Sequence, residues 1–308
     1  MAYLAKLCNE VVLFFTAVLF LIVTNPALAG TKVFIEEYTY QASEADSKFS
    51  CRAIAMEQVK RLLLEKLGTY LESETEVKNF QMTKDRITML TAGIVRAEIL
   101  DEKWDGRIYV LKAKLEADPG EVASSVERLR QDRQKSKELE ETRKTADEAL
   151  KEIEKLKREL EIAKAGQKEL GQYNEAVKRL SATDWFTKGF AYSEEAERAA
   201  DIYANAERSL RRTKGLLEIA AVTTRMMEQA QAYADVSKAQ LEQACQGAIE
   251  AYTSAIALTP NYAEAYYYRG LAHDKLGNQR RAVEDHEAAA KLGYKPAQEI
   301  LKSKGIGR

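Results

Sequence analysis

The sequence has few of the residues that carry catalytic or metal chemistry. Its 308 residues include only two histidines, three cysteines and four prolines. No C-x-x-C pair is present, and no glycine-rich segment has the spacing of a phosphate-binding or dinucleotide-binding loop. His273 and His286 have no cysteine close to them in the sequence, and we interpret both as packing residues of helices. These absences predict a protein without a metal, a cofactor or a catalytic centre.

An excess of one charge is also missing. The chain has 47 basic and 48 acidic residues, which gives a formal net charge of −1 at pH 7. A balanced chain has no overall field that would attract nucleic acid or an anionic membrane. No small-molecule substrate is evident either. We therefore expect local recognition of a protein partner, and no binding of nucleic acid.

A long apolar run occurs only near the amino terminus. The run Val11 to Thr24 is about 14 residues long, which is shorter than the roughly 20 residues of a membrane-spanning helix. A proline and a small-residue pattern ending at Ala29 follow it, as in a secretory signal peptide. We predict a signal peptide at 1–29 with cleavage between Ala29 and Gly30, and a protein secreted across the inner membrane into the periplasm. The alternative is an uncleaved leader that anchors the chain in the inner membrane.

Two cysteines remain after removal of this leader, Cys51 and Cys245. An oxidising compartment permits a disulfide between them. Each lies among apolar residues at helical spacing, which favours two separately buried thiols.

Residues 30–118 mix helix and strand patterns and are predicted to form a small α/β (α+β) domain. Residues 32–40 alternate as a strand does, and 94–117 form a hairpin whose turn, Trp104-Asp105-Gly106, uses the tolerance of glycine for positive φ. A shorter helix is expected over 83–90. One apolar stripe marks a longer helix over 47–71 and contains Cys51, Ala55, Val59, Leu62, Leu63 and Leu67.

This segment resembles the amino-terminal domain of the flagellar assembly protein FlgT and related small envelope lipoproteins. The shared features are dispersed along most of the segment: Arg52-Ala53, Gly68, Ser73-Glu74-Thr75, Asn79, Gly93 and Gly106. Such domains have no known active-site constellation. The resemblance therefore implies a role in binding or assembly.

Residues 119–170 are strongly charged and predicted to be a helical or coiled-coil spacer. Asp118 can cap its first helix, with Glu121 three residues later. Two seven-residue series run through the segment: Leu139, Ala146, Ile153 and Leu160, and Thr142, Ala149, Leu156 and Ala163. Half of this seam is alanine or threonine. A weak homo-oligomer, a single solvated helix and an intramolecular helix pair are all compatible with it.

A fixed period appears in the last part of the chain, at 248–308. Ala248, Tyr252 and Ala255 are repeated as Ala282, His286 and Ala289, with Tyr266 and Gly270 between them. The pattern and its period of roughly 34 residues resemble the tetratricopeptide (TPR) repeat. The resemblance implies antiparallel helix pairs followed by a capping helix.

An earlier region, 171–247, contains a degenerate copy of the same repeat. Trp185, Gly189 and Tyr192 occupy the consensus positions of a first helix. For the second helix, the series from Ala199 through Tyr203 to Ala206 fits only if two residues are deleted from the turn. The number of true repeats in this region stays open.

In the repeat family, positions two, five, nine and twelve of the first helix line a concave groove that binds a peptide or helix. These positions correspond to Glu264, Tyr267, Leu271 and Asp274. Tyr267 and Leu271 imply an apolar or mixed ligand. Among the three consecutive tyrosines, Tyr266 is expected inside the helix pair, Tyr267 facing the groove, and Tyr268 near the flank toward the neighbouring helix.

Together these patterns predict a mainly α protein with a small α/β amino-terminal domain, a charged helical spacer and carboxyl-terminal TPR-like α-α repeats. The function we expect is that of a non-enzymatic scaffold or adaptor of the cell envelope. One alternative is a structural or flagellum-associated assembly component that binds through the α/β domain, with helices serving oligomerisation. Another is an enzyme of unfamiliar type that uses Cys51 or a histidine.

Overall fold

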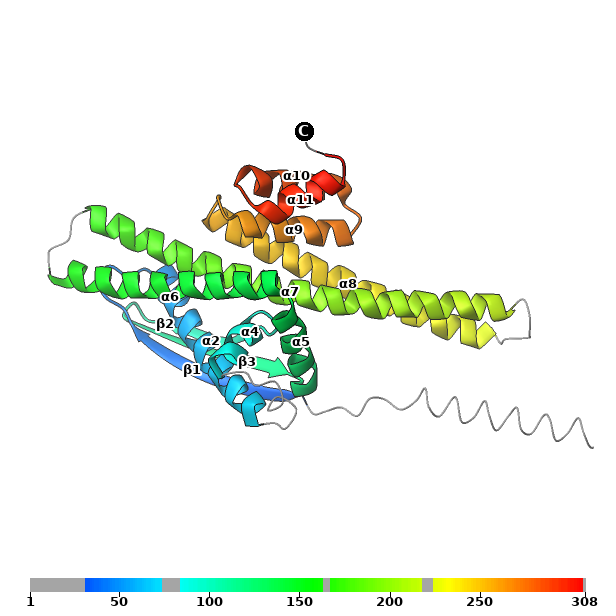
Figure 1. Cartoon of the computed structure of the whole chain (residues 1–308). Coiled ribbons are helices and arrows are strands. Elements are labelled where there is room, and N and C mark those ends of the chain that lie inside the picture. The colour runs from blue at the N-terminus through cyan, green and yellow to red at the C-terminus, as the bar shows by residue number, and fades with distance from the viewer. Residues whose placement is uncertain (1–30, 74–83, 163–166, 218–223, 307–308) are drawn as a thin grey trace, which may run out of the picture.

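The computed structural model describes residues 31–73, 84–162, 167–217 and 224–306. A small sheet with two helices lies at one end, two long helical hairpins run past it, and three short helices lie on top (Figure 1). The predicted fold class, mainly α with a small α/β domain, is confirmed. The proposed leader at 1–29, with its cleavage between Ala29 and Gly30, lies outside the described residues.

The sheet has three antiparallel strands in the order β1-β3-β2. They are β1 (Lys32–Gln41), β2 (Ala97–Trp104) and β3 (Ile108–Ala117). The predicted hairpin turn is confirmed: Gly106 has a φ of 95°, and Asp105 accepts hydrogen bonds from the backbone N–H groups of Arg107 and Ile108, at 2.8 and 2.7 Å. One face of β3 is buried and carries Tyr109, Leu111, Ala113 and Leu115.

Helix α2 (Lys48–Ser73) covers the buried face of this sheet, and α4 (Lys84–Ala92) packs against α2 in the same hydrophobic cluster. The predicted stripe of α2 is buried except for Leu62, which is 37% exposed. Cys51 and Cys245 are buried and free, so the interpretation of two separate thiols is confirmed. Thr83, where the shorter helix was expected to begin, lies outside the described residues.

The charged segment forms α5 (Pro119–Gln131) and α6 (Arg133–Ile162). Asp118 caps α5 as predicted and accepts from the N–H groups of Gly120 and Glu121, at 2.9 and 3.1 Å. The described heptad positions of α6 pack within the chain against α7 (Gln167–Leu217). Of the three alternatives for this segment, the structure has the intramolecular helix pair.

Helix α7 and helix α8 (Thr224–Leu258) form a second, longer hairpin that extends beyond the rest of the molecule (Figure 1). Three short helices follow: α9 (Ala263–Lys275), α10 (Gln279–Lys291) and α11 (Lys295–Ser303). The predicted domain boundaries after 170 and 247 fall inside α7 and α8. Among the residues that the structure describes, no helix is long and apolar enough to span a membrane.

A single hydrophobic cluster connects the sheet to the carboxyl-terminal helices. It begins with the buried faces of β3 and α2, includes Leu139 of α6, and continues through Phe186 and Phe190 of α7 to Tyr252 and Tyr268. The α/β unit is therefore packed directly against the repeat helices.

Candidate functional site

Two helix pairs, α7–α8 and α9–α10, share one close-packing feature. A Cβ atom added to Gly189 of α7 would lie 2.7 Å from the ring of Tyr252 on α8. A Cβ atom added to Gly270 of α9 would lie 2.7 Å from the ring of His286 on α10. In each pair, the absence of a side chain on the first helix lets an aromatic ring of the second helix approach its backbone. The pairs α7–α8 and α9–α10 are thus alike in this contact.

The predicted second helix of the degenerate repeat was wrong. Ala199, Tyr203 and Ala206 lie in the same continuous helix as Gly189, so they cannot form its antiparallel partner. The partner is α8, through Tyr252 and the alanines on either side of it. Many of the residues between Gly189 and Tyr252 extend α7 and α8, where a short turn was expected. Tyr252, on the second helix of the pair, therefore lies far from Gly189 in the sequence.

Leu271 and Asp274, two of the four predicted groove residues, line one cavity. This cavity has a volume of about 220 Å³ and lies between α7 and α9. Phe190 and Leu271 form an apolar wall of the cavity. Lys135 of α6 and Glu194 also line the cavity, and their side chains form an ion pair at 2.7 Å. Lys304 donates to both carboxylate oxygens of Asp274, each at 2.7 Å.

Glu264 and Tyr267, the other two predicted groove residues, do not line this cavity. The buried carboxylate of Glu138 accepts hydrogen bonds from the hydroxyls of Tyr268 and Tyr294. Glu264 and Glu138 both line a second cavity of about 350 Å³. Tyr268 lines the first cavity. Tyr267 packs its ring on Tyr294, at 5.0 Å between centroids. All four predicted groove residues are half-buried. Leu271 and Asp274 line the first cavity, Glu264 lines the second, and Tyr267 lines neither.

The prediction for Tyr266 was wrong, and Tyr268 faces neighbouring helices as predicted but is a core residue and not a boundary residue. Tyr268 is 4% exposed and packs against Tyr252 and Phe190, with centroids 5.9 and 5.2 Å apart. Tyr266 is only half-buried and lies 5.5 Å from the guanidinium of Arg269. The reason is that helices α6 and α7 cover the side of α9 that carries Tyr268, whereas a repeat pair considered alone leaves that side open.

The histidines and the cysteines are packing residues. His273 and His286 are 5% and 0% exposed, and burial lowers the pKa of both. Burial raises the pKa of Cys51 to about 11 and also raises the pKa of Cys245, which disfavours the reactive thiolate form. Among the described residues, no group of three or more histidine, cysteine and acidic side chains is arranged to hold a metal ion.

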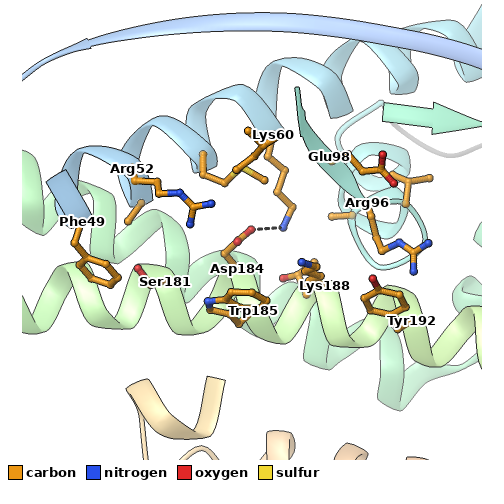
Figure 2. Close-up of a pocket in the computed structure, with 17 residues that line it drawn as sticks. Phe49, Arg52, Lys60, Arg96, Glu98, Ser181, Asp184, Trp185, Lys188 and Tyr192 are labelled. Carbon is orange, nitrogen blue, oxygen red and sulfur yellow. Dashed lines mark hydrogen bonds and ion pairs between the residues drawn. The ribbon is translucent and has the colours of Figure 1, made fainter. Parts of the chain in front are cut away.

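A further depression, which the sequence patterns do not indicate, lies between α2, the start of β2 and α7 (Figure 2). It brings together Arg52, Arg96 and Lys188, which come from three separate segments. No common spacing connects these residues, so no motif could have revealed the site.

Comparison with known families agrees with the repeat geometry. Residues 240–277 match the family model described as a TPR repeat. This stretch covers the end of α8, the whole of α9 and the turn between them. No curated protein sequence matches the chain. The TPR prediction is confirmed for this segment, and TPR helices generally form protein-interaction surfaces without catalytic groups.

Proposed function

We propose that this chain is a non-enzymatic adaptor of the cell envelope that holds a partner protein through its repeat helices. The observation that carries this proposal is the TPR match over 240–277, together with the cavity between α7 and α9. Stacked helix pairs of this type present extended binding surfaces, and the described residues contain no candidate metal centre.

The part of the groove best suited to a ligand is the cavity at Leu271 and Asp274. Its apolar wall can bury a hydrophobic side chain of a partner helix or peptide, as the sequence predicts for an apolar or mixed ligand. The flanking ions are already paired, Lys135 with Glu194 and Lys304 with Asp274. Binding there requires little desolvation of unpaired charge.

On this proposal, Leu271→Asp prevents binding of the partner. A charged carboxylate would replace part of the apolar wall that the partner's hydrophobic side chain is proposed to cover, and we expect at least a tenfold loss of partner captured from an envelope extract. Quantitative mass spectrometry of the retained proteins measures the loss. Circular dichroism checks that the variant is folded.

Leu292→Asp is the matched control, because Leu292 is 42% exposed at the end of α10 and receives the same substitution. Proteins retained by the wild type and by Leu292→Asp, and lost by Leu271→Asp, are the expected partners. An identical set of retained proteins for all three chains would contradict the groove proposal. Retention by the α/β unit of residues 31–118 would then favour the assembly alternative.

The envelope location belongs to the same proposal and rests on the signal-peptide pattern at 1–29. We expect the mature chain to begin at Gly30 and to be released with the periplasmic fraction. Mass spectrometry of its amino terminus after cell fractionation measures both properties. An intact leader in the membrane fraction would instead favour the anchored alternative.

A further inference from the structure

The depression beside α7 is an elongated trough with a volume of about 360 Å³. Helix α2 forms one wall, α7 forms the opposite wall, and the first residues of β2 lie at one end (Figure 2). Ser181 and Phe49 lie at one end of the trough, and Tyr192 and Arg96 lie at the other (Figure 2). At a rise of 1.5 Å per residue, the stretch of α7 from Ser181 to Tyr192 spans roughly 16 Å.

Among the described residues, one basic side chain of the trough has no carboxylate partner. Arg52 and Arg96 also line the trough, but they pair with Glu102 and Glu195 at 2.9 and 2.7 Å. Asp184 pairs with Lys60 at 3.3 Å, and Glu98 pairs with Lys114 at 3.3 Å. Lys188 has no ion pair with any residue that the structure describes, and its ammonium lies 4.6 Å from the ring centre of Trp185. An ammonium over an indole ring retains its capacity to attract a carboxylate.

The hydroxyl of Ser181 is a second polar group without a partner. Ser181 is 8% exposed, and its Oγ atom has no hydrogen-bond partner among the described residues. Buried hydroxyls are normally hydrogen-bonded, because an unpaired one loses its interaction with water without compensation. Since Ser181 lines the trough, a ligand there can supply the missing hydrogen bond.

An open strand edge adjoins these groups. Strand β2 is at the edge of the sheet and pairs with β3 on one side. Its residues Ala97, Glu98 and Ile99 line the trough. Free strand edges accept extended peptides through backbone hydrogen bonds. At about 3.3 Å per residue, a span of roughly 16 Å accommodates about five extended residues.

We propose that this trough binds an extended peptide segment of a partner protein, a few residues long, that carries an acidic side chain opposite Lys188 and an apolar side chain against Trp185. Lys188 selects the carboxylate, the faces of Trp185 and Phe49 bury the apolar group, and Ser181 bonds to the peptide backbone. This site is separate from the cavity at Leu271, and most of its residues come from different elements.

The test uses peptides selected from a random phage-displayed library against the full chain. Enriched peptides are expected to combine an acidic residue with apolar neighbours. Their binding is measured by fluorescence in a Trp104→Phe background, where Trp185 is the sole remaining tryptophan of the two in the sequence. Lys188→Gln is expected to weaken binding at least fivefold, and Ser181→Ala at least twofold.

Lys178→Gln is the matched control, because Lys178 lies on the same helix, pairs with Glu175 and does not line the trough. It should leave the affinity unchanged, and so should Leu271→Asp. Peptides that bind Lys188→Gln as tightly as the wild type, or an absence of enrichment, would overturn the proposal. Peptides lost only in Leu271→Asp would support the repeat groove and overturn the trough.

Discussion

Replacing Tyr252 by alanine is expected to lower the free energy of unfolding by about 3–5 kcal/mol, the usual cost of removing a large buried aromatic side chain. Tyr252 is fully buried, and its ring lies 5.7 Å from that of Phe186 and 5.9 Å from that of Tyr268. It also fills the space above the backbone of Gly189. The substitution therefore leaves a cavity where α7, α8 and α9 meet. Equilibrium unfolding in urea, followed by circular dichroism, measures the loss.

Tyr203→Ala is the matched control, since both tyrosines stand in the same A-x3-Y-x2-A pattern. Tyr203 is only half-buried, and its hydroxyl donates to Glu207 of the same helix at 2.8 Å. We expect its removal to cost less than about 1 kcal/mol. Tyr203 packs at the edge of a smaller cluster between α7 and α8. Equal losses for the two variants would therefore contradict the special role of Tyr252 at the junction of α7, α8 and α9.

The α/β unit was predictable because its signals are local. Strand alternation, the Asp-Gly turn at 105–106 and the capping residue Asp118 each depend on a few neighbouring residues. The apolar stripe of α2 similarly follows from helical periodicity alone. Leu62 deviates because the stripe is wider than the face that the sheet covers.

The pairing of the first repeat was not predictable from its period. Tyr252 and His286 are separated by the usual repeat length of roughly 34 residues. Gly189 and Gly270 occupy equivalent positions on the first helices but lie more than two such periods apart. The difference is the added length of α7 and α8. A helix pattern shows that a segment is helical, but it does not specify which other helix covers it.

The predicted groove residues could be placed only where their position depends on neighbouring residues in the sequence. Leu271 and Asp274, which the repeat positions indicate, line one cavity, because those positions depend only on their own helix pair. Their role in binding a partner stays a prediction. Glu264 lies in a different cavity because Glu138, from a much earlier part of the chain, bonds to Tyr268 between them. Long-range contacts of this kind leave no periodic signal in a single sequence.

Asp46 is the second residue for which we expect a large effect, because it contacts four elements of the fold, β1, α2, α6 and α7. Its side chain is inaccessible to solvent and lies between β1 and α2. Tyr40 and Ser50 donate to its carboxylate at 3.2 and 3.0 Å, and Tyr173 of α7 donates as well. The ammonium of Lys157 on α6 lies 3.5 Å away.

The surroundings of Asp46 determine how its contribution to the free energy of unfolding depends on pH. Burial alone would raise its pKa, but the hydrogen bonds from the backbone N–H of Ser43 and from the side chains of Tyr173, Ser43 and Ser50 outweigh burial and lower it. The carboxyl therefore has a lower pKa in the folded chain than in the unfolded chain, where about 3.9 is usual. Its stabilisation is complete above that value and is lost as the pH falls through the folded pKa.

Asp46→Asn is accordingly expected to lower the free energy of unfolding by about 3 kcal/mol at pH 7, because the amide cannot accept all of these bonds and leaves Lys157 without its counter-ion. Urea titrations between pH 2 and pH 8 should show a constant difference from the wild type above about pH 5 and a shrinking difference below about pH 4. Asp101→Asn, at an exposed position of β2, should change the free energy of unfolding by less than about 0.5 kcal/mol. A difference for Asp46→Asn that stays constant down to pH 2 would mean that the negative charge of Asp46 does not hold these four elements together.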